Sequence, residues 1–256
     1  MIEKGVAARH ALPILRQSEP LRFERLARDD ARPGIDRQVV ASLEGTLRRT
    51  LDGEVRFDDG SRALYATDGS NYRQAPIGVV LPRHAADVDA ALRAAREHDV
   101  PVLSRGGGTS LAGQCCNVAL LLDFSKYMHR VVDVDATRRL ARVQPGCVLD
   151  RLNDTARARA GLTFGPDPAT HSRCTLGGML GNNSCGSHSL LSKNHGLGLR
   201  TSDNTHSLDI LLYDGTRLTV GETPPGALHA IIQSGGHRSQ IYAALSAFVE
   251  RYGAAI

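Results

Sequence analysis

Three glycines in a row, Gly106 to Gly108, stand in the most distinctive polar segment of the sequence, with Arg105 before them and Thr109 and Ser110 after them. Consecutive glycines cost backbone entropy on folding, so they indicate a tight path or a close approach of backbone to a ligand that a side chain would block. Successive backbone N–H groups in such a bend can bind an anion, and the two hydroxyls add hydrogen-bond donors. The segment therefore predicts an anion site, with a plain glycine turn as the alternative.

Two common phosphate-binding loops do not fit this segment. Gly108 and Gly113 have the spacing of a Walker loop, but Gln114 and Cys115 occupy the positions where a lysine and a hydroxyl residue are needed. The dinucleotide fingerprint also fails, because Leu111 stands in place of its third glycine. The sequence therefore argues against a nucleotide triphosphatase and against a Rossmann turn.

Further polar segments follow downstream. Residues 165–170 contain Pro166 and Pro168, which fix the backbone as a rigid extended rim. Residues 175–186 combine open backbone with amide and hydroxyl side chains that can bond a polar ring system, and residues 196–204 form a third cluster that could close the same cavity. Such a long stretch without regular structure is improbable in a compact domain unless it wraps a ligand. Together these segments suggest a cofactor larger than one phosphate.

The regular elements expected around these segments place the triple glycine at a strand end. Apolar runs predict strands at 77–81, 100–103 and 118–124, and the helical spacing at 85–98 predicts the crossover helix that parallel strands require. The triple glycine directly follows the second of these strands. Downstream we expect strands at 131–134 and 140–143, a helix at 148–160, a hairpin of 208–213 and 217–220 that turns at Asp214 and Gly215, and a helix at 239–255.

Composition excludes several classes of protein. The chain has 256 residues, of which 41% are hydrophobic and 4% aromatic, and its net charge of +4 comes from scattered arginines, which argues against nucleic-acid binding. No stretch approaches the ~18 apolar residues of a membrane span, and the N-terminus lacks a secretion signal, so we expect a cytoplasmic chain without a membrane span. Five cysteines without a CxxC pair indicate reduced thiols, and the histidines match no common metal motif, so we expect no metal site.

In this order and placement, the glycine-rich and polar segments resemble the flavin-binding domain of vanillyl-alcohol-oxidase-type (PCMH-type) FAD-linked oxidases, and most of all the D-lactate and D-2-hydroxyglutarate dehydrogenase branch. The resemblance covers roughly residues 75–220. It implies an α+β fold in which FAD lies between two α+β subdomains. We therefore expect a partly helical N-terminal leader at 1–51 and an FAD-binding domain at 52–256, with a first subdomain at about 75–125 and a second at about 126–256.

The resemblance also implies which residues bind FAD. The first loop would hold the diphosphate, residues 166–168 would form the rim, residues 175–186 would pass the ribityl chain and the isoalloxazine, and a polar residue would precede the hairpin. The residues carried over in this way are Arg105, Gly106, Gly107, Gly108, Thr109, Ser110, Gly113, Gln114, Pro166, Asp167, Pro168, Thr175, Gly177, Gly178, Asn182, Asn183, Ser184, Gly186 and Asp203. No histidine lies between Arg105 and Gly113, so we expect noncovalent FAD.

The activity that the resemblance implies is the dehydrogenation of a D-2-hydroxy acid, a small molecule of the lactate, glycolate or 2-hydroxyglutarate class, by hydride transfer to flavin N5. An iron–sulfur domain or protein, or a quinone, would then accept the electrons. Family members are longer, and their catalytic residues have no counterpart here, so we expect a chain that is incomplete at its C-terminus. Two alternatives stay open: an FAD-binding module without catalysis, and an NADPH-dependent flavin reductase on the same fold.

Overall fold

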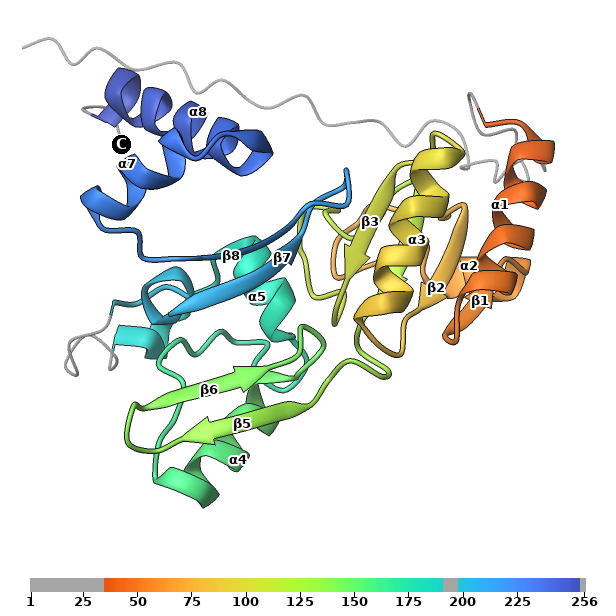
Figure 1. The fold of residues 1–256 in the computed structure, drawn as a ribbon. Helices are drawn as coiled ribbons and strands as arrows, with labels where there is room; N and C mark the ends of the chain where they lie inside the picture. Colours follow the sequence, from red (N-terminus) through yellow and green to blue (C-terminus); the bar gives the residue numbers. More distant parts are fainter. Residues whose placement is uncertain (1–34, 191–197, 254–256) are drawn as a thin grey trace, which may run out of the picture. The chain divides into compact units, whose positions relative to one another are not determined.

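The computed structural model describes residues 35–190 and 198–253. Contacts within the chain separate Met1–Ile35 from a unit that begins at Asp36, and all the helices and strands named below belong to this second unit (Figure 1). Most of the expected leader therefore lies outside the described residues. The helical part expected for it is α1 (Arg37–Thr50), which Asp36 caps by accepting a hydrogen bond from Gln38 N at 2.9 Å.

A four-stranded sheet forms the first half of the unit. Its strands are β1 (Glu54–Arg56), β2 (Gly78–Leu81), β3 (Val102–Arg105) and β4 (Leu120–Asp123), in the order β1-β2-β4-β3. Strands β2, β4 and β3 are parallel, whereas β1 runs antiparallel to β2. The three strands expected from apolar runs are confirmed, and β2 and β4 are buried along their whole length, as parallel strands covered on both faces must be.

Helices cover this sheet and connect its strands. The expected crossover helix is confirmed as α3 (Ala85–Glu97), which joins β2 to β3, and α1 packs against it with Leu43 and Leu47 fully buried (Figure 1). A short helix, α2 (Asp59–Leu64), lies in the connection from β1 to β2. The connection from β3 to the neighbouring parallel strand β4 contains no helix among its residues, and it begins with the triple glycine.

The second half of the unit is built on two separate antiparallel strand pairs. Strands β5 (Val131–Asp135) and β6 (Leu140–Val143) form one pair, and β7 (Ser207–Leu211) and β8 (Arg217–Gly221) form the other. The expected hairpin is confirmed, but its turn is longer than a two-residue turn, because Leu212 N donates to Thr216 O at 2.9 Å and three residues lie inside that pair. Gly215 supplies a positive φ of 91° in this turn.

Short helices surround these strand pairs. The expected helix α4 (Leu149–Ala160) ends at Gly161, whose φ of 65° permits the left-handed cap. It packs with α5 (Leu176–Asn182) around a small core in which Leu149, Leu152 and Met179 are buried. Single 3-10 turns follow at η1 (Ser187–Ser189) and η2 (Ser202–Asn204).

Two helices end the described chain. They are α7 (Pro225–Gln233) and α8 (Gly236–Tyr252), which pack against each other. The helix expected at 239–255 is thus confirmed with an earlier start, and Leu245, Phe248 and Val249 lie exposed on it. None of the described helices is both long and apolar enough to cross a membrane. The five cysteines are all free thiols.

Candidate functional site

The triple-glycine loop begins where β3 ends, at the carboxyl edge of three parallel strands, which is where open α/β sheets bind ligands. Among the described residues, none accepts a hydrogen bond from the backbone N–H groups of Gly107, Gly108, Thr109 or Ser110. The hydroxyl of Thr109 likewise has no hydrogen-bond partner in the described part of the chain. The loop therefore offers a set of donors that suits an anion.

The glycines of this loop pack directly against another segment of the chain. A Cβ atom at Gly106 would lie 1.9 Å from Thr175 Oγ1, and one at Gly107 would lie 2.2 Å from the carbonyl oxygen of Arg173. Sequence reasoning left open whether these glycines serve a tight path or the approach of a ligand, and the structure gives them a neighbour within the protein. As a result, the first loop and the start of the run 175–186 lie in contact.

The other side of the loop contacts the segment Tyr65–Arg73, which sequence reasoning missed. Gly69 N donates to Gly108 O at 2.9 Å, and Asp68 Oδ2 accepts from Cys115 N at 3.2 Å. Burial acts to raise the pKa of Asp68, but hydrogen bonds from Ser70 and Cys115 outweigh it and hold that pKa below its ordinary value. Asp68 is therefore a carboxylate acceptor at neutral pH, and it fixes the end of the loop.

The residues at the exit of the loop are held by local contacts. Gly113 has a φ of 79°, and a Cβ there would lie 2.9 Å from the ring of Tyr72. The side-chain oxygen of Gln114 accepts from Ala112 N at 3.1 Å. These contacts keep the exit compact without using the N–H groups of the triple glycine.

The expected rim segment is tied to the end of the run 175–186. Pro166 and Pro168 are buried, and a Cβ at Gly186 would lie 2.0 Å from Asp167 O. The hydroxyl of Ser189, which is fully buried, accepts from both Asp167 N and Gly186 N at 2.8 Å. Sequence reasoning missed Ser189, because one serine in a polar stretch carries no signal of its own.

The middle of the run 175–186 is helical. Thr175 caps α5 by accepting from Gly178 N at 3.4 Å, and Gly177 N donates to Pro145 O at 2.8 Å. Asn182 is exposed at the end of this helix, and Asn183 ends it in the left-handed conformation with a φ of 45°. The run is thus a helix with polar groups at both ends rather than a loop.

Beyond α5, the run is bonded to the third polar cluster. Asn183 Oδ1 accepts from Ser202 N at 3.0 Å, and Ser184 O accepts from both the N–H and the hydroxyl of Thr201, which is fully buried. Asp203 is exposed and closes its own turn by accepting from Arg200 N at 3.0 Å. The structure therefore joins this cluster to the run 175–186 by hydrogen bonds.

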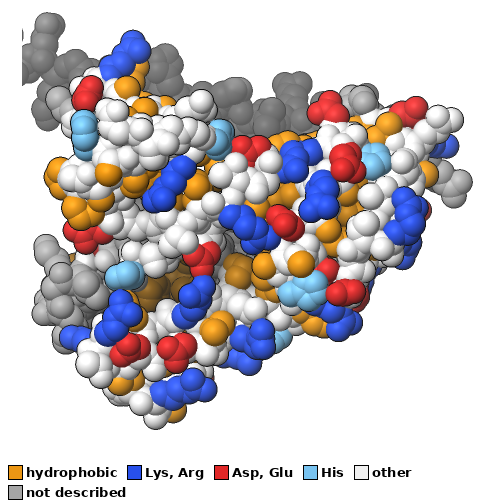
Figure 2. Space-filling view, in the orientation of Figure 1, with side chains coloured by type: hydrophobic (Ala, Val, Ile, Leu, Met, Phe, Trp, Pro, Cys, Tyr) orange, Lys and Arg blue, Asp and Glu red, His pale blue; other side chains and the backbone are white. Residues whose placement is uncertain are grey.

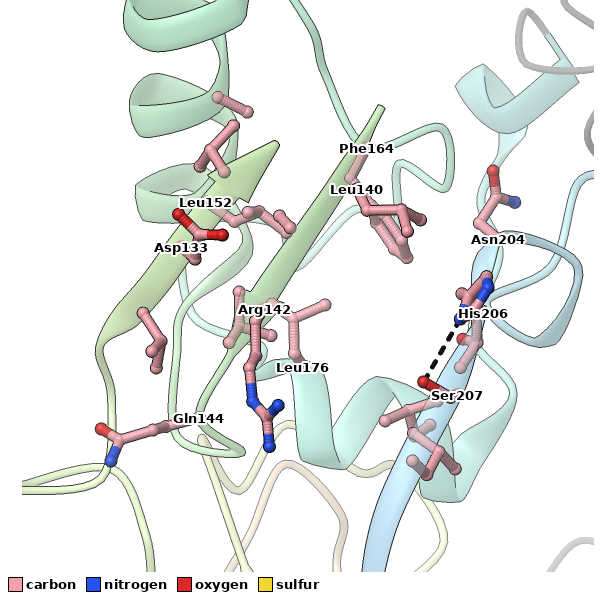
Figure 3. A pocket seen from close by; sticks show the side chains of 18 of the residues that line it. Asp133, Leu140, Arg142, Gln144, Leu152, Phe164, Leu176, Asn204, His206 and Ser207 are labelled. Atoms are coloured by element: carbon pink, nitrogen blue, oxygen red, sulfur yellow. Dashed lines mark hydrogen bonds between the residues drawn. The ribbon is translucent and has the colours of Figure 1, made fainter. Parts of the chain in front are cut away.

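A separate cavity of about 850 Å³ lies between β6 and β7 (Figure 3). Its floor is apolar, with Leu152, Phe164 and Leu176, and an ion pair between Arg142 and Asp209 joins the two strands beside it. Figure 2 shows apolar side chains at the bottom of a hollow on this face, with acidic and basic side chains interspersed around it. Of the residues expected to bind the cofactor, only Gly177 lines this cavity, so it is distinct from the triple-glycine loop.

Comparison with known sequences matches residues 76–221 to the family described as FAD binding domain. The chain is 32% identical to D-2-hydroxyglutarate dehydrogenase of Pantoea ananatis over 213 aligned residues. This alignment covers 82% of this chain and 20% of that protein. It is 35% identical to glycolate oxidase subunit GlcD of Escherichia coli over 197 aligned residues. This second alignment covers 75% of this chain and 37% of that protein. The chain thus spans between a fifth and two fifths of these relatives.

Solved structures of low sequence identity share this fold. p-Cresol methylhydroxylase with substrate bound superposes with a TM-score of 0.61 at 16% identity, covering 74% of this chain and 36% of that one. Carbohydrate oxidase from Microdochium nivale gives a TM-score of 0.60 at 16% identity, covering 73% and 38%. The expected α+β fold of the PCMH type is confirmed.

Proposed function

We propose that this chain, which belongs to the family of FAD binding domains, is the FAD-binding part of a flavoprotein that dehydrogenates a D-2-hydroxy acid. The predicted resemblance to FAD-linked oxidases is confirmed by the family match and by the relatives. The substrate class follows from those relatives, whose names include D-2-hydroxyglutarate dehydrogenase, glycolate oxidase subunit and D-lactate dehydrogenase. The observation that carries the proposal is the set of N–H groups at Gly107–Ser110 that have no acceptor within residues 35–190 and 198–253.

The chemistry of these donors fits the diphosphate of FAD. Diphosphate oxygens are anionic acceptors, and backbone N–H groups in a glycine bend hold such oxygens without the desolvation cost of a buried cation. We assign the diphosphate to residues 105–110 with Gly113 and Gln114 at the exit, and the ribityl chain and ring system to the rim at 166–168, the run 175–186 and Asp203. The contacts that join these segments support this assignment, because one extended cofactor would reach all of them.

Bound FAD would supply the hydride acceptor, flavin N5, for the hydrogen on the substrate carbon that carries the hydroxyl. The chain's part is to hold the cofactor noncovalently, since no histidine lies between Arg105 and Gly113. No residue of this chain is assigned as the catalytic base. The five free cysteines form no cluster motif, so an iron–sulfur domain or protein, or a quinone, would take the electrons. Free thiols also suit a cytoplasmic location.

Titration of the purified chain with FAD tests the proposal. Bound flavin is expected to absorb near ~450 nm, and anaerobic bleaching by D-lactate, glycolate or D-2-hydroxyglutarate would support the dehydrogenase. Bleaching by NADPH instead would replace it with a flavin reductase. Flavin that binds but is bleached by none of these would reduce the chain to an FAD-binding module, and a folded chain that takes up no FAD would overturn the proposal.

A further inference from the structure

We propose that Arg105 is a positioning residue of the triple-glycine loop. Its guanidinium holds the loop against the segment Tyr65–Arg73 by hydrogen bonds to backbone carbonyls, and it does not contact the bound diphosphate. The inference deepens the proposed function and rests on it for the identity of the ligand. It changes the role that the resemblance implied for Arg105, from contacting the cofactor to shaping the loop that does.

The guanidinium bonds three carbonyl oxygens from two segments of the chain. Arg105 Nη1 donates to Tyr65 O and to Cys115 O, both at 3.2 Å, and Nη2 donates to Thr67 O at 2.8 Å. Arg105 stands at the start of the loop and Cys115 at its end, so one side chain joins both ends of the loop to the neighbouring segment. The planar guanidinium holds its donors in a fixed fork, so its two terminal nitrogens can serve these three acceptors at once.

The third glycine of the triplet makes room for this guanidinium. Gly108 has a φ of 65°, and a Cβ there would lie 2.5 Å from Arg105 Nη2. The three glycines therefore have three different neighbours within the protein: Thr175 for Gly106, Arg173 for Gly107 and Arg105 for Gly108. The shape of the loop is set by the chain itself.

The aromatic ring behind the guanidinium is also fixed. Arg105 lies over the ring of Tyr65 at 5.4 Å, and the Tyr65 hydroxyl donates to Asp123 Oδ2 at 2.6 Å. Burial and the hydrogen bond to Asp123 raise the pKa of Tyr65 well above its ordinary value, so its hydroxyl remains a donor. Among the described residues, Arg105 forms no ion pair, so its guanidinium bonds carbonyls rather than a carboxylate.

Replacing Arg105 in the full chain separates the positioning role from a contact with the cofactor. Arg105→Lys keeps the positive charge but cannot reach the three carbonyls at once. Arg105→Gln removes the charge as well as the three hydrogen bonds. We expect both variants to weaken FAD binding about tenfold or more, because charge-assisted hydrogen bonds that shape the loop are lost. We also expect faster hydrogen exchange at the amides of residues 106–116 in protein without FAD. Arg96→Gln is the matched control, because Arg96 also donates to a backbone carbonyl, Tyr213 O at 2.7 Å, but this carbonyl belongs neither to the loop nor to the segment Tyr65–Arg73.

A second variant guards against simple misfolding. Gly108→Ala leaves Arg105 in place but directs a methyl group at its guanidinium, so it should weaken FAD binding and speed exchange in the same loop. In the Arg105→Gln background the same alanine should cost less, because the atom it meets is gone.

Three results would overturn the inference. Full FAD affinity in Arg105→Lys with loss in Arg105→Gln would assign the effect to charge alone. Weaker FAD binding with unchanged hydrogen exchange in the unliganded loop would indicate that Arg105 contacts the cofactor directly. Additive effects of Gly108→Ala and Arg105→Gln on FAD binding would show that the two residues do not interact. If the unmodified chain binds no FAD, the proposed function fails, but the exchange measurement still decides whether Arg105 holds the loop.

Discussion

A single methyl group at Gly107 should separate the triple-glycine loop from its neighbour. In Gly107→Ala the new Cβ would lie 2.2 Å from Arg173 O and 3.1 Å from the carbonyl carbon of the same residue. Ordinary contacts between carbon and carbonyl oxygen lie at about 3.3–3.6 Å. The backbone of one of the two segments must therefore move by roughly 1 Å, since neither atom belongs to a flexible side chain. Gly107→Val brings two further methyl groups and should cause a larger shift.

The expected cost falls on both stability and cofactor binding. Overpacking of this kind typically costs about 1–3 kcal/mol of unfolding free energy. If the diphosphate binds here as proposed, a shift of roughly 1 Å also takes the N–H groups of residues 107–110 out of hydrogen-bonding range of it. Hydrogen bonds to a charged group contribute about 1.5–3 kcal/mol each, so losing one of them should weaken FAD binding roughly tenfold to a hundredfold.

Gly226→Ala is the matched control for the same substitution. A Cβ at Gly226 meets no atom within 4 Å, and the residue lies in α7, where alanine is favoured over glycine by about 0.5–1 kcal/mol. Denaturant unfolding and FAD titration of both variants give the comparison. The control should be as stable as the unmodified chain or more so, with unchanged FAD affinity. Unchanged affinity in Gly107→Ala would refute the assignment of the diphosphate to this loop.

Hydrogen bonds from Lys126 and Tyr127 lower the pKa of Glu54 from 4.5 to about 2, so its stabilisation is complete above pH 4.5 and is lost as the pH falls toward 2. Urea unfolding should show Glu54→Gln less stable than the unmodified chain at pH 7, by roughly 1–2 kcal/mol, with the difference vanishing near pH 2; a constant difference would contradict this. Ser189→Ala should cost about 1–3 kcal/mol, because two backbone N–H groups lose their acceptor, and a loss below about 0.5 kcal/mol would argue against that role. Iodoacetamide should label exposed Cys185 in the folded chain but not Cys147, whose pKa is raised by burial, and mass mapping of labelled Cys147 without unfolding would contradict the structure.

The central sheet could be predicted because its strands are continuous apolar runs. Residues 77–81 and 118–124 read as buried strands, and the helical spacing between 85 and 98 accounts for the crossover from β2 to the parallel strand β3. β1 could not be predicted in the same way, because Glu54, Val55 and Arg56 include one apolar residue. This strand is specified by its pairing with β2, a contact that no local pattern records.

The location of the candidate site could be predicted, but the contacts that build it could not. Glycine, proline and asparagine mark the segments because they limit or free the backbone locally. Their partners are mostly backbone atoms distant in sequence, such as the carbonyls of Tyr65 and Thr67 that Arg105 bonds. A carbonyl is present at every residue, so the sequence cannot indicate which one accepts. Ser189 shows the same limit for a side-chain acceptor, because the N–H groups that donate to it belong to Asp167 and Gly186, which lie 22 and 3 residues away.

The packing of the triple glycine also bears on how the loop would bind its ligand. If the glycines only made room for the ligand, no protein contact would hold the free loop in place. Binding would then have to order the loop, and the conformational entropy lost in doing so would reduce the affinity. Instead, the chain itself occupies the space beside Gly106, Gly107 and Gly108, and Arg105 and Asp68 hold the end of the loop. The N–H groups of residues 107–110 are thus held in place before any anion arrives. In the proposed site, the glycines therefore serve the ligand indirectly, because they let the protein preorganise the N–H donors of the loop.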